Sequence, residues 1–340
     1  MLTEKDYERI RKELDECSKP LFFFDDDPDG LCSFLLLYRY KKEGRGIVVK
    51  TVPRLDAKFA ERVEEYGPDK VFVLDVAVVL EEFVERVNVP IVWIDHHQPI
   101  ELNRVTCINP MIKSPASNDP TSSICYNAVK QDAWIGAVGT VGDWHIPNFI
   151  VEFNKEYPDF KIGKISPGKA LFDTKIGRIA RIFSFLLKGP TKDVMVSVKV
   201  LSRISGPEEI LEANTAQSKF LKNRYEDIEK KYEDLLQEAK KKAGKDKFIV
   251  FTYQADKWSF TSELSNELLY RYPKKIVIVG REKSGEIRMS LRSSKPILNA
   301  LQKSLVGIEG YGGGHENACG ANVKAEDFGR FLGNLRSFLM

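Results

Sequence analysis

Histidine, paired cysteines and long apolar segments are all scarce in this sequence. Histidine occurs four times in 340 residues, and the five cysteines form no Cys-x-x-Cys pair. An odd, scattered set of this kind excludes a disulfide framework and indicates reduced, mostly buried thiols. No apolar run approaches the roughly 20 residues that a membrane-spanning helix needs, and the charged N-terminus lacks a signal-peptide pattern. We therefore expect a cytoplasmic protein without a membrane partner.

An excess of one charge is also missing. Lys and Arg number 52 and Asp and Glu 49, which gives a formal net charge of +3. This balance excludes a protein coated with basic residues, although it leaves room for a local basic groove. An apolar content of 43% in a chain of this length is enough to fill the cores of two domains.

What the sequence does contain is acidic and histidine residues directly after apolar segments. The segments and the clusters that follow them are Leu21–Phe24 with Asp25–Gly30, Val71–Leu74 with Asp75, and Val89–Ile94 with Asp95–His97. Apolar segments of this length predict buried strands, and parallel strands in α/β proteins carry their binding sites at the carboxyl ends. The three clusters therefore predict one metal site at one edge of a sheet.

The residue types restrict the metal. The first cluster holds four carboxylates, which repel one another unless a cation lies between them, and these are Asp25, Asp26, Asp27 and Asp29. A calcium loop would need a glutamate where Leu36 stands. Imidazole beside carboxylate suits Mn²⁺, Zn²⁺ or Fe. Since adjacent histidines in an extended segment point in different directions, we expect one of His96 and His97 to bind metal and the other to face substrate, with Asp95 orienting one ring.

Further candidates follow later in the chain. Gly142-Asp143 supplies another carboxylate at a turn, where it is either a ligand or a simple cap, and we expect His145 to have a structural role. Near the C-terminus, Arg292 lies among serines, and three glycines precede His315. Glycines allow backbone N–H groups to approach an anion closely, whereas a simple tight turn is the alternative explanation.

The order of predicted elements favours an α/β fold with two domains. Strands and helices alternate to about residue 150, which indicates a parallel sheet. A helix is expected over 121–137, ended by Gly139–Asp143, and helices continue to 206. A long charged helix over 207–242 has a narrow apolar seam, which fits either a coiled coil or an interdomain helix packed along one stripe. A second α/β pattern then begins.

The chain resembles the DHH/DHHA1 phosphoesterase superfamily, which includes RecJ-like nucleases, oligoribonucleases and some pyrophosphatases. The resemblance lies in six motifs in order, namely Asp25–Gly30, Asp75, Asp95–His97, Gly142-Asp143, Ser290–Ser293 and Gly312–Gly320. It implies a DHH catalytic domain with a helical extension over 1–206, a connector helix over 207–244 and a DHHA1 substrate-binding domain over 245–340.

The resemblance also implies roles. Asp75 would bridge two Mn²⁺ ions, with Mg²⁺ as an alternative; Asp27 would bind one ion, and Asp29, His96 and Asp143 the other. His97, with Asp75 and Asp95, would take part in catalysis. Asp25 stands near a position where many members carry histidine, so that either Asp25 replaces that ligand or one metal is bound more loosely. The predicted substrate contacts are Ser290, Arg292, Ser293, Gly312, Gly313, Gly314 and His315.

The activity expected first is exonuclease cleavage of single-stranded DNA or RNA by two-metal hydrolysis, with 3′→5′ polarity by resemblance alone. One alternative is hydrolysis of short oligonucleotides or small nucleotides, such as a cyclic dinucleotide or 3′-phosphoadenosine phosphate. Near-neutral charge favours this alternative, since proteins that bind long strands neutralise several phosphates. Another is a scaffold for a replication or repair protein, although the intact aspartates argue against lost activity.

Overall fold

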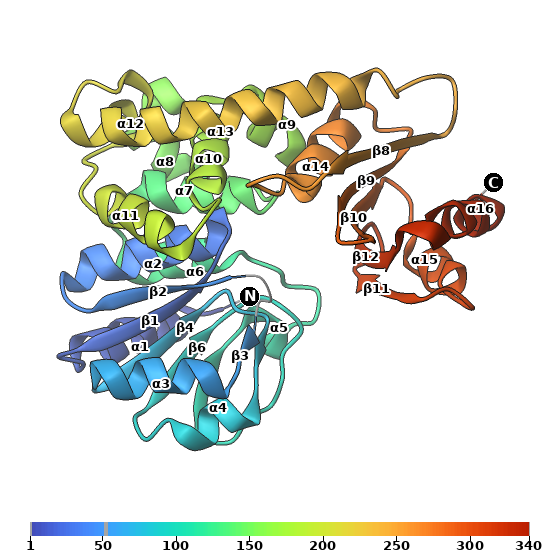
Figure 1. Cartoon of the computed structure of the whole chain (residues 1–340). Coiled ribbons are helices and arrows are strands. Elements are labelled where there is room, and N and C mark those ends of the chain that lie inside the picture. Colours follow the sequence, from blue (N-terminus) through green and yellow to red (C-terminus); the bar gives the residue numbers. More distant parts are fainter. Residues whose placement is uncertain (1, 51–53, 340) are drawn as a thin grey trace. The chain divides into compact units, whose positions relative to one another are not determined.

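A computed structural model describes residues 2–50 and 54–339 and divides the chain into two compact units, Met1–Tyr225 and Glu226–Met340 (Figure 1). The predicted boundaries at 206/207 and 244/245 stay predictions. Among the described residues, no helix combines the length and apolar composition needed to cross a bilayer. All five cysteines are free and four of them are buried, as the sequence predicts.

The first unit is built on a five-stranded parallel sheet in the order β2-β1-β4-β6-β7. Its strands are β1 (Pro20–Asp25), β2 (Arg45–Val49), β4 (Lys70–Leu74), β6 (Ile91–Ile94) and β7 (Val105–Ile108). A separate two-stranded pair joins β3 (Arg54–Leu55) to β5 (Val78–Val79). The α/β class is therefore confirmed. The strand predicted over 47–52 begins as β2, and its last two residues lie outside the described part of the chain.

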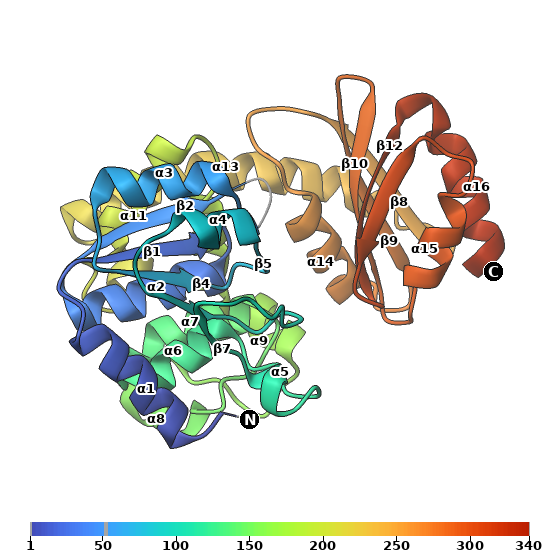
Figure 2. The same cartoon turned by 90° about the horizontal axis from the view of Figure 1, so that it is seen from below.

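Helices cover both faces of this sheet, and strand β1 shows why (Figure 2). Phe22 and Phe24 contact Phe34 of α2 (Pro28–Lys41), whereas Phe23 contacts Phe59 of α3 (Ala57–Tyr66) and Phe83 of α4 (Glu81–Arg86). Alternate side chains of a strand point to opposite faces, so three consecutive phenylalanines supply both cores. All three are fully buried.

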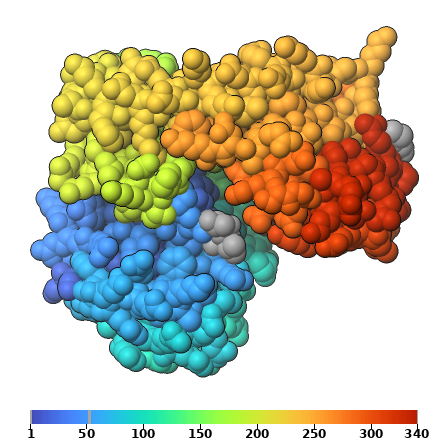
Figure 3. Space-filling view, in the orientation of Figure 1, coloured from blue at the N-terminus to red at the C-terminus, as the bar shows by residue number. Residues whose placement is uncertain are grey.

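The other helices of the unit surround this sheet. They are α1 (Glu4–Asp15), α5 (Pro110–Lys113), α6 (Thr121–Val129), α7 (Ala133–Gly142), α8 (Ile150–Glu156), α9 (Pro167–Asp173), α10 (Lys175–Leu186), α11 (Thr191–Leu201) and α12 (Pro207–Glu212), with a 3₁₀ turn at Pro158–Phe160. α13 (Ala216–Lys240) begins here and continues into the second unit. Figure 3 shows the surface of each unit, coloured along the sequence as in Figure 1.

Three element predictions differ in detail from the structure. The helix over 121–137 is two helices, because Lys130 (φ 52°) and Asp132 (φ 54°) adopt left-handed conformations between α6 and α7. The glycines at 139 and 142 lie inside α7 rather than breaking it. The sequence predicts a short strand over 107–110 that leaves the sheet, but β7 pairs with β6 as an edge strand.

The charged helix predicted over 207–242 is interrupted between α12 and α13. Ala213 adopts a left-handed conformation (φ 50°), and Thr215 and Ser218 then exchange hydrogen bonds that begin α13. The seam is buried within each unit: Tyr225 stacks on Phe185 in the first unit, and Tyr232 donates to Glu267 in the second. The packed stripe is therefore the explanation that the structure supports.

The second unit contains a five-stranded mixed sheet in the order β11-β12-β10-β9-β8. Its strands are β8 (Phe248–Gln254), β9 (Ile276–Lys283), β10 (Glu286–Ser293), β11 (Gly310–Gly314) and β12 (Ala318–Lys324). The helices are α14 (Thr261–Arg271), α15 (Leu298–Ser304) and α16 (Phe328–Leu339), with a 3₁₀ turn at Ala325–Asp327. Leu291, Leu301 and Leu335 are fully buried in the core that joins this sheet to α15 and α16.

Candidate metal centre

The acidic and histidine clusters of the first unit lie at the carboxyl ends of three neighbouring strands. Asp25 ends β1, Asp75 follows β4, and Asp95–His97 follows β6. Because β1 pairs with β4 and β4 with β6, these residues meet at one edge of the sheet. The convergence predicted from the sequence is therefore present in the fold.

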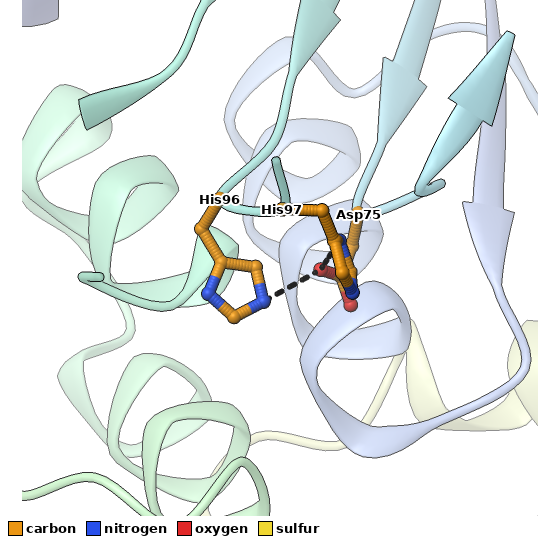
Figure 4. Close-up of side chains that lie close together, drawn as sticks. All are labelled: Asp75, His96 and His97. Carbon is orange, nitrogen blue, oxygen red and sulfur yellow. Dashed lines mark ion pairs between the residues drawn. The ribbon is translucent and has the colours of Figure 1, made fainter. Parts of the chain in front are cut away.

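His96 lies beside Asp75 and His97 (Figure 4). Its Nε2 atom is 3.4 Å from Asp75 Oδ1 and 3.8 Å from Asp143 Oδ2. Two groups of potential ligand atoms each fit within 4.8 Å, and both include His96: one with Asp75 and His97, the other with Asp29 and Asp143. One imidazole is thus shared between two adjacent positions where a cation can bind.

Asp25 and Asp27 extend the cluster at the start of α2. Asp27 is the N-cap of this helix and accepts a 2.9 Å hydrogen bond from Gly30 N with Oδ1. A Cβ atom on residue 30 would lie 2.7 Å from the backbone N and O of Asp25, so only glycine lets α2 begin this close to β1. The turn therefore holds both carboxylates at the strand end.

Electrostatic repulsion is strong in this cluster. Burial, with a further contribution from neighbouring Asp29, raises the pKa of Asp27 to about 7. Burial, followed by nearby carboxylates, also raises the pKa of Asp25 and Asp75 well above the ordinary range and raises that of Asp29. Several buried carboxylates cannot all ionise together without a compensating positive charge.

Asp75 also has an unusual backbone. Its φ angle is +61°, in the left-handed region that residues other than glycine seldom adopt, and its backbone N donates to Ile94 O at 3.0 Å. Asp and Asn tolerate this conformation better than other residues. The kink turns the chain at the end of β4 and directs the carboxylate toward His96.

Asp95 orients His97 rather than His96. Asp95 Oδ1 lies 2.8 Å from His97 Nδ1, and Asp95 Oδ2 accepts from the backbone N of His97 at 2.9 Å. Asn109 Nδ2 donates to the carbonyl of His97 at 2.8 Å. Burial lowers the pKa of His97, but the bond to Asp95 and the surrounding carboxylates outweigh burial and raise the pKa to about 9.

We expect Asp95→Asn to lower the pKa of His97 from about 9 toward or below the ordinary 6.5 in metal-free protein, because the charge that favours the imidazolium is removed. The raised value means that the protonated ring stabilises the fold below pH 6.5 and that this contribution is lost as pH rises through 9. NMR titration of the imidazole measures the shift. His145, which contacts Asp143, is the internal control and should titrate unchanged; an unshifted His97 would contradict the assignment.

Sequence reasoning missed two residues at the start of α6. Thr121 N donates to Asp29 Oδ2 at 2.7 Å, Ser122 N donates to Asp29 Oδ1 at 2.9 Å, and the Ser122 hydroxyl donates to the same oxygen. Thr121 Oγ1 also donates to Asp75 Oδ1 at 3.1 Å. The helix itself was predictable, but nothing in a single sequence indicates which carboxylate its N-terminus approaches.

Gly139, within α7, makes room for Ser122, which donates to Asp29. A Cβ on residue 139 would lie 2.5 Å from Ser122 Oγ, so glycine lets α7 pack against the start of α6. α7 then ends at Asp143, where His145 Nδ1 lies 2.6 Å from the Asp143 carbonyl and 3.3 Å from its Oδ2. His145 therefore holds Asp143, in line with the structural role expected for it.

Among the predicted substrate residues of the second unit, Arg292 lies near the end of β10. Arg292 Nε donates to Asn266 Oδ1 at 2.7 Å, Nη2 to Ser262 Oγ at 3.2 Å and Nη1 to the Cys319 carbonyl at 3.3 Å. Asn266 and Ser262 of α14 were not predicted from the sequence. They fix the guanidinium plane, and burial lowers the pKa of Arg292.

The remaining predicted contacts lie nearby in the sheet. Ser290 and Ser293 are buried in β10. Gly312–Gly314 belong to edge strand β11, with Gly314 at φ +130°, and the tight turn follows at 315–318, where His315 N donates to Ala318 O at 2.9 Å. His315 is exposed. The glycines are therefore not themselves the turn.

Two family models match this chain. Residues 21–149 match the DHH family N-terminal domain, and residues 245–340 match the DHHA1 domain. The chain belongs to the DHH/DHHA1 superfamily. The matches confirm the DHH and DHHA1 families for the N-terminal and C-terminal parts of the chain, and the candidate metal centre lies in the DHH part. No protein of curated function matches the sequence.

Solved structures share the fold of this DHH/DHHA1 chain at low sequence identity. RecJ from Thermus thermophilus in complex with Mn²⁺ is 16% identical, with a TM-score of 0.62 over 98% of this chain and 54% of RecJ. A DHH domain described as a member of a family of ribosomal proteins is 15% identical, with a TM-score of 0.67 over 98% of this chain and 89% of that domain. The pGpG-specific phosphodiesterase PggH from Vibrio cholerae is 14% identical, with a TM-score of 0.52 over 94% of this chain and 97% of PggH. The chain spans about half the length of RecJ.

The DHH domain has a donor set that fits divalent cations. Among the described side chains, six buried polar atoms have no hydrogen-bond partner, and two of them, His96 Nδ1 and Asp143 Oδ2, belong to this cluster. Buried polar atoms are seldom left unpaired, so the observation fits a group that binds ligands. Carboxylate oxygens with one imidazole suit Mn²⁺ or Mg²⁺ in this setting.

We expect Ser122→Ala to weaken Mn²⁺ binding about 10- to 100-fold, the usual effect of removing a side chain that orients a metal ligand. Asp29 would lose the hydroxyl donor and keep the two backbone donors. Isothermal titration with Mn²⁺ measures the change. Ser123→Ala is the matched control, since Ser123 is buried in the same turn but donates to neither Asp29 nor Asp75 among the described contacts. If Ser122→Ala and Ser123→Ala bind Mn²⁺ with equal affinity, Ser122 does not orient a metal ligand.

Proposed function

We propose that this protein is a metal-dependent phosphodiesterase that removes nucleotides from an end of single-stranded DNA or RNA. The observation that carries the proposal is the convergence of Asp29, Asp75, His96 and Asp143 at the carboxyl edge of the parallel sheet. Buried carboxylates around a shared imidazole have a clear role in holding divalent cations and little role in stabilising a fold by themselves.

In this proposal Asp75 would help to hold both ions, with Asp25 and Asp27 as further ligands of one and Asp29, His96 and Asp143 as further ligands of the other. Asp25 would replace a histidine with an oxygen ligand, which preserves a hard donor set. Two divalent cations, when bound, neutralise phosphate oxygens and lower the pKa of water, which is the chemistry that phosphodiester hydrolysis requires.

The chain's own residues would orient the substrate. His97, kept protonated near neutral pH by Asp95, would donate a hydrogen bond to a phosphate oxygen as negative charge develops. Arg292, fixed by Asn266 and Ser262, would contact a second phosphate or the sugar-phosphate backbone. Gly312–Gly314, Ser290, Ser293 and His315 would complete the contacts of the DHHA1 domain.

Two relatives suggest different substrate lengths. One structure is described as exonuclease RecJ bound to manganese, and PggH is described as specific for pGpG. The formal net charge of +3 favours a short substrate, since binding to long strands usually relies on many cationic contacts. Hydrolysis of short oligonucleotides is therefore the second candidate.

A length series tests the proposal. Purified protein with Mn²⁺ is given single-stranded DNA and RNA, labelled at the 5′ or 3′ end, from dinucleotides to strands of several tens of nucleotides. The exonuclease proposal expects stepwise products from one end of the long strands, whereas cleavage restricted to two- to five-mers would support the short-substrate alternative. If no length is cleaved with Mn²⁺ or Mg²⁺, the proposal of phosphodiesterase activity is wrong and a scaffold role is favoured.

A further inference from the structure

A groove of about 640 Å³ lies along β2, the edge strand of the parallel sheet. None of the acidic or histidine residues of the metal centre lines this groove. Its apolar surface comes from α2, β2 and α11 and consists of Phe34, Tyr38, Ile47, Met195 and Val198. In Figure 3 the yellow-green surface of α11 adjoins the blue surface of the first fifty residues.

The backbone of β2 is available for pairing. Among the described strands, β2 pairs only with β1, so its outer edge presents N–H and C=O groups that no strand uses. Gly44 and Gly46 are part of the groove lining. An exposed edge beside an apolar groove is the arrangement in which an extended peptide adds a strand to a sheet.

In the described part of the chain, the charged side chains that line the groove are all positive. Arg45, Arg62 and Lys199 line it and are exposed, whereas no acidic residue is part of the lining. Arg62 forms an ion pair with Glu65 of its own helix, in which both side chains are more than half exposed, so this pair is weak. The groove is therefore complementary to negative charge.

Two other occupants fit less well. A second copy of this chain pairing through β2 would bring the same three cations together, and like charges at an interface are unfavourable. Single-stranded nucleic acid would match the positive charge, but the stacking of its bases needs open aromatic faces. Phe34 is buried and stacks on Phe24 with ring centroids 4.7 Å apart, so one of its faces is already covered.

We propose that this groove binds an acidic peptide segment of a partner protein, which adds to the sheet as a strand along β2. The main chain of the peptide pairs with the edge of β2, and an aliphatic side chain enters the apolar surface between Ile47 and Val198. Acidic side chains lie beside Arg45, Arg62 and Lys199. This proposal is independent of the hydrolytic activity, because the groove and the metal centre share no residues.

Selection from a random peptide library tests this docking site. A phage-displayed library of peptides of about nine residues, long enough to span the five residues of β2, is selected on the full chain and counter-selected on the Arg45→Glu/Lys199→Glu variant. We expect the enriched peptides to be acidic, with aliphatic residues at alternate positions. A synthetic peptide of the enriched sequence should bind in fluorescence anisotropy and lose affinity at least about tenfold with the charge-reversed variant.

Two controls distinguish this mode from simple charge attraction. Lys192→Glu changes an exposed lysine of α11 that does not line the groove, and it should leave the affinity unchanged. The same peptide with N-methylated backbone nitrogens on alternate residues should no longer bind, since it cannot donate to the edge of β2. The proposal would be overturned if the selection failed to enrich acidic peptides, or if Lys192→Glu lost as much affinity as the charge-reversed variant. It would also be overturned if the N-methylated peptide bound fully, or if a single-stranded oligonucleotide competed with the peptide.

Discussion

Replacing Asp75 by Asn should reduce phosphodiester cleavage by at least about a thousandfold, the scale at which loss of a central charge-stabilising group affects catalysis. In the proposed centre Asp75 contributes to both cation positions, so one lost charge weakens both. Asn is the informative replacement because it tolerates the φ angle of +61° that Asp75 adopts. The amide can also still accept the hydrogen bond from Thr121 Oγ1.

The measurement combines cleavage rates with Mn²⁺ titration by calorimetry. Asp75→Asn should weaken binding of the ions. The unfolding temperature of the metal-free variant should be equal to or higher than that of the metal-free parent, since a repelling carboxylate is removed. Asp69→Asn is the control, because Asp69 contacts Cys17 and the backbone of Ser18 away from the centre. A parental cleavage rate in Asp75→Asn would refute the bridging role.

Replacing Arg292 by Ala should raise the KM for an oligonucleotide about a hundredfold, as expected for one or two lost hydrogen bonds from a charged group. The effect should depend on the substrate. A small diester such as bis(p-nitrophenyl) phosphate needs the metal centre and offers no chain for the DHHA1 domain to contact, so its kcat and KM should not change.

Arg292→Lys separates charge from geometry. Lysine keeps the positive charge but cannot reproduce the planar contacts with Asn266 and Ser262, so most of the loss in oligonucleotide affinity should persist. Arg288→Ala, on the same strand β10 and exposed, is the matched control and should bind normally. If Arg292→Ala impairs cleavage of the small diester as strongly as that of the oligonucleotide, Arg292 acts through stability rather than substrate binding.

The fold was predictable because the sequence patterns are local. Phe22–Phe24 and Ile91–Ile94 are apolar runs whose strand character needs no distant partner. The helix interruptions were harder to predict, since Ala213 and Lys130 adopt left-handed conformations that neither residue type prefers. Only tertiary packing makes such conformations favourable.

The candidate site divides in the same way. Asp75, His96 and Asp143 could be chosen from strand-end context and family motifs, and the structure brings them together. Thr121 and Ser122 could not be chosen in this way. They bond to Asp29 across sequence separations of 92 and 93 residues, and a contact over such a distance leaves no local pattern in the sequence. Asn266 and Asn109 were missed for the same reason, since each acts through a partner on another element.

In the proposed metal centre, the crowding of carboxylates at the sheet edge would link folding thermodynamically to metal supply. Because the pKa of Asp27 is raised to about 7, the metal-free fold loses stability as pH rises from the ordinary aspartate range through 7. Cations that bind only the folded chain reverse this loss in proportion to the logarithm of their free concentration. The level of free divalent metal around the protein would then set how much of the chain is folded as well as how fast it works, so metal scarcity would reduce its abundance and its activity together.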